Sequence, residues 1–171
     1  LRHLFPKVVF YNRIVELERE VAVPLILFIK KVLLGKCTGI GFVDSTPLRV
    51  YKNQRIHIHK AFKGIAQRGK CSMGWFFGFK LHLICNEKGE LLNFMITPGD
   101  VDDRKPLEYK AFVDFIYGNL VGDKGYISKN LFQRLFVDGI QLITKLKSNM
   151  KGALMCVSNR LLLRKRAIIE T

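Results

Sequence analysis

The order of the short apolar segments constrains the fold of this chain more than any other feature of its sequence. Five segments have the length and composition of strands: residues 40–44, 75–85, 91–97, 120–122 and 140–144. The first three follow one another with no helical pattern between them, which favours an antiparallel meander. Helical patterns separate the later segments, which favours parallel strands joined by right-handed crossovers.

The intervening patterns complete the expected order of elements. We expect helices at about residues 105–117 and 129–138 and from residue 159 onward. Asp102 and Asp103 are most simply N-caps of the first of these helices, and Ser128 is the expected cap of the second. The order strand, strand, strand, helix, strand, helix, strand, helix predicts an α/β fold, in which helices flank a mixed five-stranded sheet. This is the ribonuclease-H-like arrangement.

Turn residues set the expected ends of the early strands. Ser45, Thr46 and Pro47 predict that a turn ends the first strand directly after Asp44. The basic residues 49–73 show little periodicity, so we expect a long loop or irregular ribbon there. Residues 86–89 predict a hairpin turn between the second and third strands.

The N-terminal part of the chain has a different pattern. Residues 12–34 read as an amphipathic helix that Pro24 kinks or restarts, and glycines then break it. We therefore divide the chain into a helical appendage, 1–39, and a main domain, 40–171. The chain opens without Met and stops at Thr171 after an apolar helical run, so we expect the main domain to be incomplete at its C-terminus.

A strong positive charge points to a polyanionic partner. The formal net charge is +15 and the sequence pI is about 9.9, which suits nucleic acid or an anionic membrane surface. The best apolar stretch, residues 21–29, contains Pro24 and is far shorter than the roughly 20 residues that a spanning helix needs. We therefore expect no membrane partner.

The four cysteines indicate reduced thiols. Cys37, Cys71, Cys85 and Cys156 form no CxxC pair, so we expect mostly buried free thiols in a cytoplasmic protein. A zinc site that joined one of them to His57 and His59 would match no defensible ligand spacing. Both histidines are more simply part of a solvated basic loop, with phosphate contact as the alternative.

Acidic residues are scarce and unevenly placed. Only 14 of the 171 residues are Asp or Glu, and none lies in residues 45–86 or 139–169, where lysines and arginines are frequent. Asp44 directly precedes the first of these acid-free stretches, and Glu170 directly follows the second. A carboxylate beside DNA is repulsive unless a cation lies between them, and Mg²⁺ accepts carboxylate, phosphate and water oxygens.

The expected fold would bring two of these carboxylates together. Asp44 ends the first strand and Asp123 the fourth, and these two strands are parallel neighbours in the ribonuclease-H-like order. Neighbouring strands lie roughly 5 Å apart, and ligands of open α/β sheets bind outside the carboxyl ends of strands. Taken singly, each aspartate is also compatible with an ordinary turn, and Glu170 with a solvated helix residue.

Five segments, in order along the chain, resemble motifs of the DDE-type transposases of bacterial insertion sequences. Residues 42–48 resemble the first-aspartate motif, and residues 121–126 the second-aspartate motif. Residues 164–170 are similar to the segment around the glutamate. The other two matching segments are 75–83, which looks like the second strand, and 97–103, which resembles the link into the first core helix.

This resemblance implies an enzyme that cleaves DNA at the ends of a mobile element and joins them to a target. It implies that Asp44, Asp123 and Glu170 bind two Mg²⁺ ions, for which Mn²⁺ can substitute, and that Arg166 contacts the DNA end. Two departures are visible: Leu163 stands where many relatives have tyrosine, and the position of their lysine beyond the glutamate lies past Thr171.

The expected partners are the DNA of the element's ends and of the target, and a homodimer is an open possibility. The basic residues expected to contact DNA are Arg49, Arg55, Lys60, Lys63, Lys80, Lys124, Lys145, Arg164 and Arg166.

Two alternatives remain open from the sequence. The first is an inactive, truncated remnant that at most binds DNA, and the second is a nuclease of the same fold. Among the remaining residues, Trp75 and its neighbours could stack on bases, although strand core is the simpler expectation for Phe77 and Phe79. His82 points opposite Phe79 and could face the site.

Overall fold

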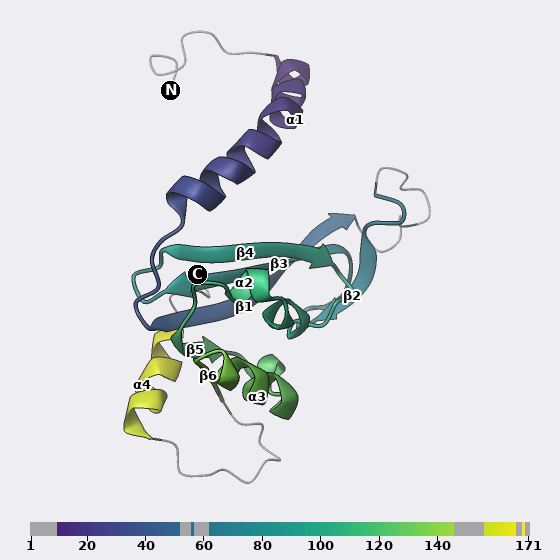
Figure 1. Ribbon diagram of the computed structural model, residues 1–171. Helices are drawn as coiled ribbons and strands as arrows, with labels where there is room; N and C mark the ends of the chain where they lie inside the picture. Colours follow the sequence, from purple (N-terminus) through teal and green to yellow (C-terminus); the bar gives the residue numbers. More distant parts are fainter. Residues whose placement is uncertain (1–9, 52–55, 57–61, 146–155, 167–168, 170–171) are drawn as a thin grey trace. The chain divides into compact units, whose positions relative to one another are not determined.

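The computed structural model describes residues 10–51, 56, 62–145, 156–166 and 169 (Figure 1). The chain forms two compact units that divide between Leu34 and Gly35.

The N-terminal unit is helical. Helix α1 (Tyr11–Phe28) runs through Pro24 without a break and continues into the π-helical segment η1 (Ile29–Leu33). The helix therefore does not restart at Pro24, because one missing N–H removes only one of its many backbone hydrogen bonds. Within the described residues, no helix has the length and apolar composition that crossing a membrane requires.

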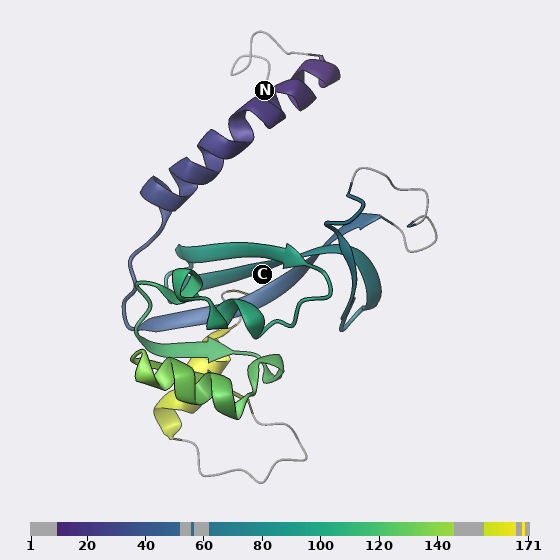
Figure 2. The ribbon, with the colours of Figure 1, turned by 45° about the vertical axis from the view of Figure 1, so that its right-hand side comes forward.

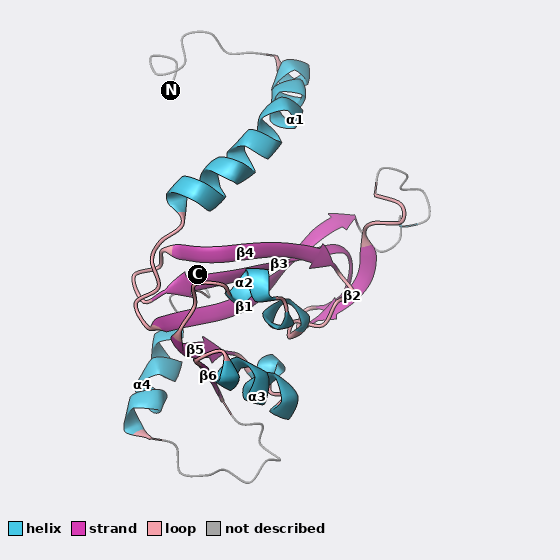
Figure 3. Ribbon diagram, viewed as in Figure 1, coloured by secondary structure: helices cyan, strands magenta, loops and turns pink. Residues whose placement is uncertain are grey.

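A mixed sheet forms the centre of the second unit (Figure 3). Its strands in chain order are β1 (Ile40–Tyr51), β2 (Gln67–Cys71), β3 (Gly74–Asn86), β4 (Leu91–Pro98), β5 (Gly118–Gly122) and β6 (Ile140–Thr144). β3 pairs antiparallel with β1 on one side, and with β2 and then β4 on the other. β5 pairs parallel with both β1 and β6. The predicted ribonuclease-H-like order is confirmed, with β2 as an additional strand.

Helices cover both faces of this sheet (Figure 2). On one face, the buried side chains of η3 (Lys105–Glu108), α2 (Lys110–Val113) and α3 (Lys129–Val137) pack against those of β1 and β3. On the other face, Leu163 of α4 (Val157–Lys165) packs against Phe42 and Val121. Ser128 caps α3 as predicted, since its hydroxyl accepts a hydrogen bond from the Leu131 N–H.

The first strand is longer than its turn residues indicate, so the prediction that it ends at Asp44 is wrong. The Gly39 carbonyl accepts a hydrogen bond from the Asn119 N–H, so the backbone groups of odd-numbered residues in β1 face β5. β5 pairs with β1 only as far as Phe42. Pro47, which has no N–H, therefore has its backbone nitrogen toward an edge where no strand pairs with β1. No hydrogen bond of the sheet is lost there.

Two other elements differ from expectation. The segment expected as an irregular loop, 49–73, contains the end of β1 and the whole of β2. The helix expected at 105–117 is instead a short 3-10 turn followed by a single helical turn, η3 and α2.

The buried face of β3 is the opposite of the expected one. Burial alternates along β3, and the buried set includes Phe76, His82 and Ile84, whereas Phe77 and Phe79 are only half-buried. Both faces of this strand carry large apolar residues, so its alternation alone does not identify the inner face.

Candidate active site

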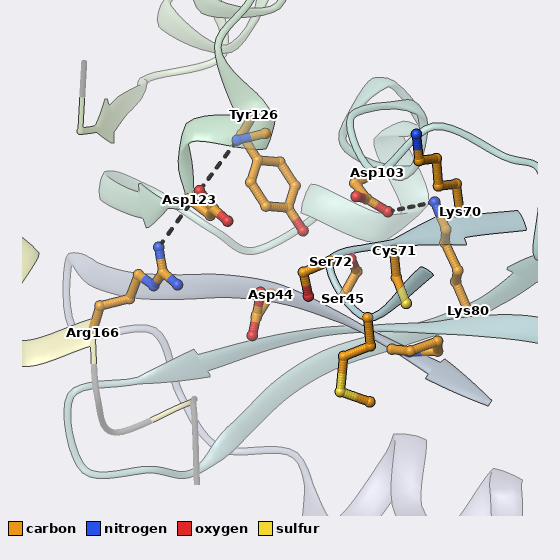
Figure 4. Close-up of a pocket in the computed structure, with 13 residues that line it drawn as sticks. Asp44, Ser45, Lys70, Cys71, Ser72, Lys80, Asp103, Asp123, Tyr126 and Arg166 are labelled. Carbon is orange, nitrogen blue, oxygen red and sulfur yellow. Dashed lines mark hydrogen bonds and ion pairs between the residues drawn. The ribbon is translucent and has the colours of Figure 1, made fainter. Parts of the chain in front are cut away.

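A cavity of about 340 Å³ opens where β5 has ended and β1 continues past it, paired only with β3 (Figure 4). Its walls come from β1, the β2–β3 hairpin, the segment after β4, the segment after β5 and the end of α4. The lining residues are Asp44, Ser45, Pro47, Lys70, Cys71, Ser72, Met73, Lys80, Asp103, Asp123, Gly125, Tyr126 and Arg166.

Two of the predicted carboxylates lie in this cavity at equivalent places on neighbouring strands. The parallel pairing of β1 with β5 ends at Phe42 and Val121. Asp44 and Asp123 each stand two residues beyond that pair, on strands that are spaced about 4.8 Å apart where they pair. The shared register therefore brings both side chains to one cavity, although Asp44 lies within its strand and not at the end.

A cation from the other end of the chain lies beside Asp123. The Arg166 guanidinium comes within 3.9 Å of an Asp123 carboxylate oxygen, which also accepts a hydrogen bond from the Gly125 N–H at 3.3 Å. Arg166 follows α4 directly, so the packing of α4 on the sheet brings it to the site. Arg166, predicted as a contact of the DNA end, is thus placed beside Asp123 in the cavity.

Tyr126 is a site residue that sequence reasoning missed. Its side chain is buried, and its ring packs so closely on Gly122 that an added Cβ there would lie 3.0 Å from it. Burial raises the pKa of the Tyr126 hydroxyl, and the negative charges of Asp103, Asp44 and Asp123 raise it further, while the nearby Ser45 side chain lowers it. The hydroxyl therefore stays protonated and can act as a hydrogen-bond donor.

A third aspartate belongs to the cavity and is paired with lysine. The Lys80 ammonium donates to Asp103 at 2.9 Å and to the Val101 carbonyl at 2.8 Å, and only 8% of Lys80 is exposed. Asp103 is thus no helix cap, whereas the Asp102 carboxylate accepts a hydrogen bond from the Arg104 N–H just before η3 and also pairs with the Arg104 side chain. Asp103 lies five residues beyond the end of β4, in a stretch that also contains Asp100 and Asp102, so no signal in the sequence singles it out.

His82 does not belong to the site. It is fully buried and lies 2.9 Å from the Thr97 hydroxyl, and burial lowers its pKa to about 4. It is therefore a neutral core residue, and the expectation that it could face the site is wrong.

The donor set of the cavity suits a hard divalent cation. Asp44 and Asp123 supply carboxylate oxygens, and Mg²⁺ typically takes one or two protein carboxylates and completes its shell with phosphate and water. Among the residues that the structure describes, no group of three His, Cys, Asp or Glu side chains could hold a metal ion. Glu170, the third predicted ligand, lies outside the described residues.

The other predicted DNA contacts lie at the surface or outside the described part. Lys80 lines the cavity, as does Arg166. Arg55 and Lys60 lie outside the described residues, as do His57 and His59. The exposed members of the set are Arg49, Lys63, Lys124, Lys145 and Arg164.

The cysteines are less buried than expected. Cys37, Cys71 and Cys85 are half-buried and Cys156 is exposed, and all four are free thiols. Cys71 lines the cavity.

Comparisons with known proteins give one family. The family model described as "Transposase DDE domain" matches residues 34–171, well over half of the chain. A solved structure, the "Cryo-EM structure of piggyBac transposase synaptic complex with hairpin DNA (SNHP)", is similar with a TM-score of 0.49 and 15% identity. That alignment covers 78% of this chain and 28% of the other, so the present chain spans under a third of that chain's length. A search of curated proteins found no match.

Proposed function

The chain belongs to the transposase DDE domain family, and on that premise we propose that it cleaves DNA at the ends of a mobile element and joins those ends to target DNA. The observation that carries this proposal is the convergence of Asp44 and Asp123 on one cavity from two parallel strands. We further propose residues 40–171 as the catalytic domain, residues 1–39 as a helical appendage, and a bacterial insertion sequence as the source.

The proposed metal ligands are Asp44, Asp123 and Glu170. Held there, two Mg²⁺ ions, or Mn²⁺ in their place, would stabilise the attacking and leaving oxygens of an in-line displacement at phosphorus. Arg166 would neutralise part of the carboxylate charge and contact a phosphate. The protonated Tyr126 hydroxyl would donate a hydrogen bond into the same cavity.

The proposed reaction has two displacements at phosphorus. In the first, water loses a proton and attacks the phosphorus, and the P–O3′ bond breaks so that the departing 3′ oxygen takes up a proton. In the second, that 3′-hydroxyl loses its proton and attacks a phosphodiester of the target, whose own 3′ oxygen leaves. No covalent protein–DNA intermediate is involved.

Charge supports DNA as the partner. The chain carries a net charge of +15, and cations neutralise phosphates and release counterions without reference to base sequence. The five exposed basic residues named above, with Arg55, Lys60, Lys80 and Arg166, are the proposed contacts. A homodimer and a cytoplasmic location stay part of this proposal.

The test is metal-dependent nicking of DNA that carries the ends of the flanking element. We expect nicking with Mg²⁺ or Mn²⁺, and its loss in both Asp44→Asn and Asp123→Asn. The matched control is Asp138→Asn, an exposed acid outside the cavity, which should nick normally. Nicking that survives both site substitutions would overturn the proposed ligand set.

Two other outcomes identify the alternatives. Cleavage without transfer of the freed 3′ end to a second DNA would indicate a nuclease of the same fold. Salt-sensitive DNA binding with no cleavage in either metal would indicate an inactive remnant.

A further inference from the structure

The hairpin of β2 and β3, which forms one wall of the cavity, carries the chain's one tryptophan, Trp75. Trp75 is 55% exposed, which is unusual for so large an apolar side chain within a strand. Lys70, Ser72 and Met73 of the same hairpin line the cavity. The function proposed above gives this exposed ring no role.

Two cations flank the ring. The Arg68 guanidinium carbon lies 5.6 Å and the Lys70 ammonium 5.9 Å from the centre of the Trp75 ring. Lys70 lies directly opposite Trp75 in the antiparallel pairing of β2 with β3. The hairpin therefore presents an aromatic surface and positive charge together.

The ring also faces the same side of the sheet as the first proposed metal ligand. Asp44 pairs with Leu83 across β1 and β3, so these two side chains share a face. Burial alternates without interruption along β3, which puts Trp75 on the face of Leu83. Trp75 and Asp44 thus lie on one face of the sheet, and a DNA strand that crossed this face to Asp44 would meet Trp75.

Close backbone packing holds the hairpin in place. A Cβ added to Gly69 would lie 2.0 Å from the Gly99 carbonyl oxygen, so β2 rests directly on the segment after β4. The Gly99 N–H in turn donates to the Gly78 carbonyl of β3 at 3.0 Å. Because the backbone is fixed in this way, the position of Trp75 relative to the cavity is defined.

We propose that Trp75, with Arg68 and Lys70, forms a stacking platform for an unpaired base of the DNA strand bound in the cavity, an inference that rests on the function proposed above. An unpaired base is required because both faces of a base within a duplex are already stacked. Stacking of a base on an aromatic side chain is stronger than an exposed cation–π contact. A base therefore displaces a cation from the ring, and the cation then lies beside the phosphates.

The chain's own fluorescence tests this platform. In Asp44→Asn protein without added metal, no cleavage occurs, and Trp75 is the only tryptophan. Titration with a single-stranded oligothymidylate should quench its emission, and a blunt duplex of equal length should quench it much less. Emission that does not change when single-stranded DNA saturates the protein would overturn the proposal.

Affinity measurements separate stacking from charge. Trp75→Ala should weaken single-strand binding roughly five- to hundredfold, with duplex binding nearly unchanged, and Trp75→Phe should retain most of the affinity. Phe136→Ala, which removes an exposed aromatic of α3 that lies outside the cavity, is the matched control and should bind normally. Circular dichroism would verify folding of each variant, and equal losses for single strand and duplex would refute a stacking role.

The two proposals can fail separately. Quenching and Trp75-dependent affinity without nicking by the unsubstituted chain would count against the catalytic proposal alone. Normal nicking without quenching would count against the platform alone.

Discussion

Individual residues at the site owe their properties to neighbours far away in the sequence. Asp44 and Asp123 could be predicted because each lies near the end of a recognisable apolar segment. Tyr126 and Asp103 could not be predicted, because their properties come from groups across the cavity. Three carboxylates raise the pKa of Tyr126, and Lys80 of β3 pairs with Asp103.

The raised pKa of Tyr126 predicts a loss of stability in alkali. Unfolding returns the hydroxyl to its ordinary pKa of 10.0, so above about pH 10 the unfolded chain releases a proton that the folded chain keeps. The free energy of unfolding should therefore fall as pH rises beyond that value. Tyr126→Phe should show a smaller fall when urea unfolding is compared at pH values below and above 10. Equal pH dependence in the two proteins would contradict the assigned cause.

At the scale of elements, β1 and the β2–β3 hairpin build the site. β1 extends past the end of β5, which leaves one flank of Asp44 open as the cavity. The hairpin closes another wall because two glycines allow its backbone to rest on the segment after β4.

Gly69→Ala should therefore destabilise the chain. The added methyl would overlap the Gly99 carbonyl, and forcing such a group into packed backbone costs roughly 1–3 kcal/mol. Urea unfolding would measure this loss. Gly125→Ala is the matched control, because a Cβ at Gly125 meets nothing within 4 Å and the change should be nearly neutral. Equal stability of the two variants would show that the close approach of Gly69 and Gly99 contributes little.

At the scale of the whole molecule, charge dominates the expected interaction with DNA. The net charge of +15 is spread over many exposed lysines and arginines, while the carboxylates of the site are few. On the proposed function, long-range attraction would bring DNA to the surface, and the cavity would have only to orient it.

DNA affinity should fall steeply with salt. For a protein that contacts six to ten phosphates, the loss is roughly 10³- to 10⁵-fold between about 50 and 200 mM salt. Lys145→Gln should reduce the slope of log affinity against log salt by about 1. Lys110→Gln, an exposed lysine of α2 outside the predicted contacts, should leave the slope unchanged. A shallow slope in the unsubstituted chain would rule out the predicted extent of phosphate contact.

The sequence by itself determined the features that depend on neighbours along the chain. Strand and helix order, the hairpin turn at residues 86–89 and the Ser128 cap follow from local periodicity and local hydrogen bonds. The parallel placement of β1 beside β5, and with it the meeting of Asp44 and Asp123, followed from that order and the handedness of crossovers.

Only the tertiary structure decided the features that depend on contacts across the fold. β1 passes through Pro47 because β3 pairs with it on one side and no strand requires the missing N–H on the other. β3 buries Phe76 in place of Phe77 because the Phe76 ring packs against the backbone of Gly69 and Gly99, a contact that an alternation of two apolar faces cannot indicate. Such choices depend on which surfaces meet, and a one-dimensional pattern does not contain that information.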